Sequence, residues 1–70
     1  MERKSVSSSS IGSIGYDPDS QTLEVGFVKG TVYQYPGVPQ EVYEEFLASS
    51  SKGSYLNGMI KVRFVGNRVE

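Results

Sequence analysis

The chain has 70 residues with no cysteine and no histidine, and its formal net charge is -1 at pH 7. The absence of cysteine excludes disulfides and thiolate chemistry, and the absence of histidine removes the commonest metal ligand and the side chain that titrates most readily near neutral pH. The length suits one small domain, and no apolar run is long enough to cross a bilayer, so we expect a cytoplasmic protein without a membrane partner.

The N-terminal residues are polar. Met1-Glu2-Arg3-Lys4 lacks the apolar stretch of a signal peptide. We predict that residues 1–5 form a flexible leader and that residues 6–60 form the single folded domain. The serine run Ser7–Ser10 either belongs to the leader or starts a strand.

Two strands are predicted next. Ile11 and Ile14 are three residues apart, which breaks strict alternation, and a bulge at Gly12-Ser13 would restore the phase. The turn sequence Asp17-Pro18-Asp19-Ser20 ends the first strand, because proline presets its φ angle and aspartate bonds nearby amides. Clean alternation over 22–27 then predicts a second strand with Leu23, Val25 and Phe27 facing inward.

The loop after this strand decides which way Tyr33 and Tyr35 point. A two-residue turn would require Lys29 at positive φ, which lysine resists, whereas a three-residue loop over 28–30 requires that conformation only at Gly30. We therefore predict the longer loop. It pairs Val25 with Tyr33 and places both tyrosines on the apolar face, as structural residues of the core.

Helical spacing follows the third strand. Pro39 suits a first turn, and Val42, Tyr43, Phe46 and Leu47 share one face, so a main helix should cover the sheet. Gly53 is predicted to stop this helical region, and Ser54 to cap a shorter second helix with its own apolar edge. That edge comprises Tyr55, Leu56, Met59 and Ile60.

The tail, residues 61–70, alternates charged and apolar residues over Lys61–Val65. It is expected to add a strand, to pair with another molecule or to remain loose. The predicted fold class is α+β: a three-stranded antiparallel meander with one face covered by a main helix and a short second helix, and with the tail as a candidate extra strand.

No catalytic or metal motif accompanies this fold. Asp17, Asp19 and Glu24 do not form a calcium loop, because later ligand positions hold Leu23 and Val28. The serines have no histidine to activate them as nucleophiles. We therefore expect no catalytic residue, no metal, no cofactor and no enzyme activity.

An ordered series of landmarks resembles the KTSC domain over about Val6 to Ile60. The series comprises Ser8, Ile11, Tyr16-Asp17, Leu23, Val25, Phe27, Gly30, Tyr33-Gln34-Tyr35, Gly37-Val38-Pro39, Tyr43, Ala48, Ser50, Gly53, Tyr55-Leu56-Asn57 and Ile60. The resemblance implies a short bacterial domain of unestablished function, occurring alone or at the C-terminus of some lysyl-tRNA synthetases. Leu56 departs from the pattern, since phenylalanine is the commoner residue there, and the change removes one stacking ring.

The resemblance and the charge pattern together favour a small RNA-binding or tRNA-associated accessory module. Single-stranded RNA is bound by exposed rings and nearby cations. The candidate residues are Tyr55 and the basic residues of the C-terminal third, namely Lys52, Lys61, Arg63 and Arg68. The alternative is a protein-interaction or homodimerisation module without a nucleic-acid role, in which the tail pairs with another chain.

Overall fold

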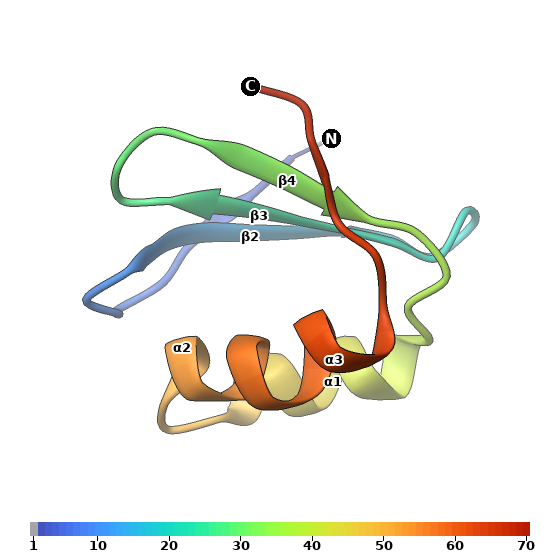
Figure 1. Ribbon diagram of the computed structural model, residues 1–70. Helices are drawn as coiled ribbons and strands as arrows, with labels where there is room; N and C mark the ends of the chain where they lie inside the picture. The colour runs from blue at the N-terminus through green and yellow to red at the C-terminus, as the bar shows by residue number, and fades with distance from the viewer. Residues whose placement is uncertain (1) are drawn as a thin grey trace.

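The computed structural model describes residues 2–70, and it shows a sheet with helical segments packed on one of its faces (Figure 1). Within these residues the sheet has five strands in the order β1-β2-β3-β4-β5, all antiparallel to their neighbours. The elements are β1 (Lys4–Ser5), β2 (Ile11–Asp17), β3 (Thr22–Phe27), β4 (Val32–Tyr35), α1 (Gln40–Ala48), α2 (Lys52–Tyr55), the π-helical η1 (Leu56–Ile60), α3 (Lys61–Arg63) and β5 (Asn67–Arg68). The α+β prediction is confirmed, with short strands added at both edges of the meander.

The hairpin between β3 and β4 has the predicted three-residue loop. Gly30 adopts a φ of 104°, and the Phe27 amide donates a hydrogen bond to the Thr31 carbonyl at 2.8 Å. A side chain at Gly30 would resist this left-handed conformation. The resulting register pairs Val25 with Tyr33 and Leu23 with Tyr35.

The pairing of β2 with β3 also follows the sequence-based prediction. The register shifts between Ile11 and Ser13, so Gly12 occupies the predicted bulge. At the other end of β2, the carboxylate of Asp17 accepts hydrogen bonds from the Asp19 amide at 3.1 Å and from the Ser20 hydroxyl at 3.0 Å. These bonds close the turn that separates the two strands.

The main helix, α1, begins directly after Pro39 and places Phe46 in the core without solvent exposure. Burying such a side chain contributes about 1.5–3 kcal/mol. Near the start of the helix, the Tyr43 ring stacks on Tyr16 with centroids 4.5 Å apart. The Tyr16 hydroxyl donates to the Val38 carbonyl at 2.6 Å, which attaches the loop before α1 to the sheet.

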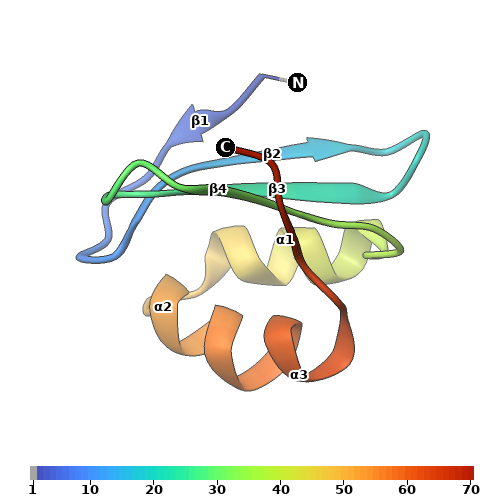
Figure 2. The same cartoon turned by 45° about the horizontal axis from the view of Figure 1, so that its top comes forward.

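The second helical segment runs continuously from α2 through η1 to α3, and it lies beside α1 under the same face of the sheet (Figure 2). The start of this segment differs from the sequence-based prediction. Gly53 and Ser54 lie inside α2, whose N-cap is Ser51, so Gly53 does not stop a helix and Ser54 does not cap one. The predicted apolar edge is present, with Leu56 and Ile60 buried.

Both ends of the chain contribute strands. Residues 1–5 were predicted to be a flexible leader; residue 1 lies outside the described residues, and Lys4–Ser5 forms β1 against β2. In the tail, Lys61–Arg63 continues the helix, and the strand lies further along, at Asn67–Arg68. This β5 strand pairs with β4 of the same chain, across which the tail passes (Figure 1).

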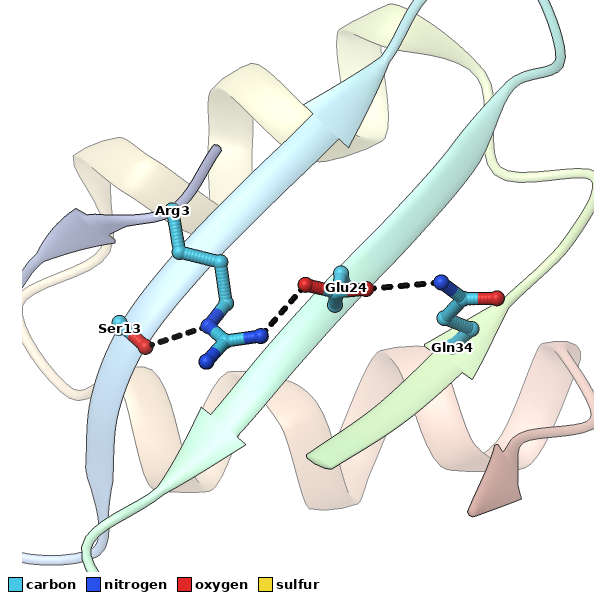
Figure 3. A network of polar contacts seen from close by, with 4 residues as sticks. All are labelled: Arg3, Ser13, Glu24 and Gln34. Carbon is cyan, nitrogen blue, oxygen red and sulfur yellow. Dashed lines mark hydrogen bonds and ion pairs between the residues drawn. The ribbon is translucent and has the colours of Figure 1, made fainter. Parts of the chain in front are cut away.

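The outer face of the sheet carries a closed polar network (Figure 3). Glu24, in β3, is only 6% exposed, and its carboxylate accepts hydrogen bonds from Arg3 and, at 2.7 Å, from Gln34. Arg3 also donates to the Ser13 hydroxyl at 3.0 Å. Burial by itself would raise the pKa of Glu24, but the bonds from Gln34 and Arg3 outweigh it, and the pKa is lowered overall.

Candidate functional site

Two adjoining depressions lie where the β1–β2 loop, the β3–β4 hairpin and the start of the second helical segment meet. We call the first the aromatic groove; it has a volume of about 430 Å³ and is lined by Ser9, Ser10, Phe27, Val28, Lys29, Thr31, Tyr33, Gly53, Leu56, Asn57 and Lys61. We call the second the serine pocket; it measures about 370 Å³ and is lined by Ser7, Ser8, Ser9, Ser50, Ser51, Lys52, Gly53, Ser54 and Asn57.

The two tyrosines of β4 differ in what they contribute to this region. Tyr35 is 2% exposed and belongs to the core, as predicted, and burial, followed by the neighbouring Tyr33, raises the pKa of its hydroxyl. Tyr33 packs against the core but is half-buried and lines the aromatic groove. Its ring meets Phe27 edge-on, with centroids 5.8 Å apart. Tyr33 therefore supplies both packing and ring surface at the groove.

The charge in both depressions is positive. Lys29 and Lys61 line the aromatic groove, and Lys52 lines the serine pocket. Among the described residues that line either depression, none is aspartate or glutamate. The combination of an aromatic wall with cations and no opposing carboxylate suits a flat, anionic ligand.

Three of the predicted site residues lie outside the two depressions. The Tyr55 ring stacks on Phe46 with centroids 5.6 Å apart, and its hydroxyl donates to the Glu45 carboxylate at 2.8 Å. Burial, followed by this hydrogen bond, raises the pKa of that hydroxyl. Arg63 is exposed on α3, and Arg68 is exposed on β5, opposite Tyr33. The structure thus brings Lys52 and Lys61 to the candidate site, while Tyr55, Arg63 and Arg68 lie elsewhere.

The known family that the chain matches spans all the residues that line the two depressions. The family model described as the KTSC domain matches residues 7–64. The chain belongs to the KTSC domain family. Its similarity to solved structures agrees, since the crystal structure of a KTSC domain protein from Yersinia pestis has a TM-score of 0.91 and 44% sequence identity, over 99% of this chain and 97% of that one.

Relatives of this KTSC domain occur in short and in long proteins. A protein from Tsukamurella paurometabola is 46% identical over 59 residues, which make up 84% of this chain and 88% of that protein. A lysine–tRNA ligase from a Nostoc species is 43% identical over 49 residues, which make up 70% of this chain but only 9% of the ligase. The family thus includes short proteins and a small part of a much larger one.

Sequence reasoning missed several residues of the KTSC domain's groove, chiefly Phe27, Lys29 and Asn57. Lys29 was considered only as a loop residue, and its place before Gly30 at a hairpin tip was the one signal of its exposure. The two serine runs were also visible, but nothing in their spacing showed that the fold brings them together. Within the described residues, no cluster of metal-ligating side chains and no helix long and apolar enough to span a membrane is present.

Proposed function

We propose that this KTSC domain is a small, non-enzymatic module that binds single-stranded RNA in the aromatic groove. The observation that carries the proposal is the juxtaposition of the Tyr33 ring with Lys29 and Lys61 in one groove free of carboxylates. Exposed tyrosine rings stack on unpaired bases, and lysines beside them neutralise phosphates. Single strands suit such a groove better than duplexes, because their bases are free to stack.

The comparison with relatives supports a connection to tRNA. Part of a protein named lysine–tRNA ligase is similar to this chain, and a small domain within such a protein would be well placed to touch its nucleic-acid substrate. We therefore extend the proposal to a tRNA-associated accessory role, in which the domain holds an unpaired region of RNA without taking part in chemistry.

The protein-interaction alternative ranks second. Val62 and Val65 are 74% and 78% exposed, which would suit an apolar contact, but they offer no charge complementarity of their own. The tail strand that would pair with another chain is already paired with β4 within this one. The groove therefore carries the stronger proposal.

A salt-dependent titration tests RNA binding. We would titrate a fluorescein-labelled, unstructured RNA oligonucleotide with the protein at several salt concentrations and follow fluorescence anisotropy. If Lys29, Lys52 and Lys61 each contact one phosphate, log affinity should fall with log salt at a slope of about -2, from about 0.7 per contact. The variant K29Q/K52Q/K61Q should bind weakly and show a slope near zero.

Lys4 provides the matched control. It is exposed on β1 and lines neither depression, so Lys4→Gln should leave both the affinity and the salt slope almost unchanged. Absence of binding by the unaltered protein at low salt would refute RNA binding. An equal loss of affinity in the Lys4 variant would show that the attraction is not specific to the groove.

A further inference from the structure

The aromatic groove and the serine pocket form one continuous surface. Ser9, Gly53 and Asn57 line both depressions, so a chain-like ligand with its base on Tyr33 would have the serine pocket next to it. The walls differ, because the groove is partly aromatic and aliphatic whereas the pocket is lined mainly by serines. A nucleotide has the same division between an apolar, flat base and a polar sugar–phosphate.

The close approach of two serine runs builds the pocket. Ser7–Ser10 lies between β1 and β2, and residues 50–54 comprise the end of the loop after α1 and the start of α2. They meet at Gly53, where an added Cβ would lie only 3.0 Å from the Ser10 hydroxyl oxygen. The absence of a side chain at Gly53 leaves room for the Ser10 side chain where the start of α2 faces the β1–β2 loop.

The hydroxyls of the pocket fall into two groups. Ser8 accepts hydrogen bonds from the Ser10 and Ile11 amides, each at 3.3 Å, and Ser51 donates to Ser54 at 3.0 Å. These bonds shape the walls. By contrast, the hydroxyls of Ser7, Ser9 and Ser50 take part in none of the hydrogen bonds found among residues 2–70, which leaves them available to a ligand.

Lys52 is the one charged residue that lines the serine pocket in the described chain. Its ammonium group donates to the Ser49 carbonyl at 3.1 Å, which holds the long side chain in place. An ammonium group has three donors, so two remain for an anionic oxygen such as that of a phosphate.

We propose that the serine pocket receives the ribose–phosphate part of the bound strand and recognises the ribose 2′-hydroxyl, so that the domain prefers RNA to DNA of the same base sequence. A serine hydroxyl both donates and accepts, as does the 2′-hydroxyl, and deoxyribose lacks this partner. The inference rests on the proposed function, because it assigns the sugar's place in the same site.

Two oligonucleotides of equal length test the inference: oligo-uridylate and oligo-deoxyuridylate, which differ only in the 2′-hydroxyl. We expect the RNA to bind roughly five- to tenfold more tightly, the effect of one or two neutral hydrogen bonds. The variant S7A/S9A/S50A should lose this preference through weaker RNA binding, with DNA binding unchanged. Ser5→Ala is the control, since Ser5 is exposed on β1 and lines neither depression.

The outcomes separate the two proposals. If both oligonucleotides bind equally well to the unaltered protein, sugar recognition is wrong and groove binding survives. If neither binds at low salt, the proposed function fails as well. If the triple serine variant keeps the full RNA preference while its circular dichroism matches the unaltered protein, the preference does not come from these hydroxyls.

Discussion

On the outer face of the sheet, Glu24 is surrounded by protein groups that satisfy its charge (Figure 3). By contrast, no carboxylate is among the described residues that line the aromatic groove with Lys29 and Lys61. Arg3 reaches Glu24 from the N-terminal segment, and Gln34 reaches it from β4. The charge of Glu24 is therefore balanced by groups of the protein, whereas the charges of Lys29 and Lys61 are not balanced by any residue that lines the groove. We infer that the first region stabilises the fold and the second is available for a ligand.

The largest expected effect comes from removing the Arg3 side chain that pairs with Glu24. Arg3→Ala removes the ion pair and leaves Glu24, in β3, poorly solvated, so we expect a loss of about 1.5–3 kcal/mol in the free energy of unfolding, measured by urea denaturation. Lys4→Ala, at the exposed neighbouring position, should change stability by less than about 0.5 kcal/mol.

The division of roles between the two regions would be contradicted if Arg3→Ala left the unfolding midpoint unchanged or weakened RNA binding in the folded protein. A groove substitution should behave in the opposite way. Lys61→Gln should alter the salt dependence of RNA affinity while leaving the urea midpoint almost unchanged, because Lys61 is exposed and packs little of the core.

A smaller effect should appear on acidification. Because the pKa of Glu24 is lowered in the folded protein, its stabilising contribution is complete above the pKa of an unfolded glutamate, about 4.3, and is lost as the pH falls through the lower folded value. The free energy of unfolding should therefore decrease below about pH 4.3. Glu24→Gln should show a shallower decrease over the same interval, and an identical pH profile would contradict this role.

Local rules predicted the strand-rich half of the molecule well. Three features each depend on the backbone preferences of one or two residues: the left-handed conformation at Gly30, the bulge at Gly12 and the turn at Asp17. These preferences set the register, and the register places Tyr35 in the core. Such features can be read from sequence because they need no information about distant segments.

The features that were missed depend on distant contacts. Gly53 lies inside a helix and leaves room there for the Ser10 side chain, which is more than forty residues earlier in the chain. Glu24, an outward-facing strand residue, is buried because Arg3 crosses over it. Alternation over Lys61–Val65 resembled a strand, yet its first three residues extend a helix.

The candidate site was only partly predictable for the same reason. Lys52 and Lys61 stood out as cations in a basic stretch, but Lys29 comes from a hairpin tip and joins them only through the fold. Tyr55 looked like an exposed ring beside Lys52, but Phe46 covers one face of it and Glu45 binds its hydroxyl. Tyr33, which lines the aromatic groove, is therefore the ring that we propose for binding.

Mapping the contact surface by nuclear magnetic resonance tests the central claim most directly. Oligo-uridylate would be titrated into ¹⁵N-labelled protein while amide shifts are followed. The largest changes should occur at Lys29, Tyr33, Asn57 and Lys61, and the amide of Glu24 should not move. Changes concentrated on the outer face, or around Val62 and Val65 with the groove unaffected, would contradict the account.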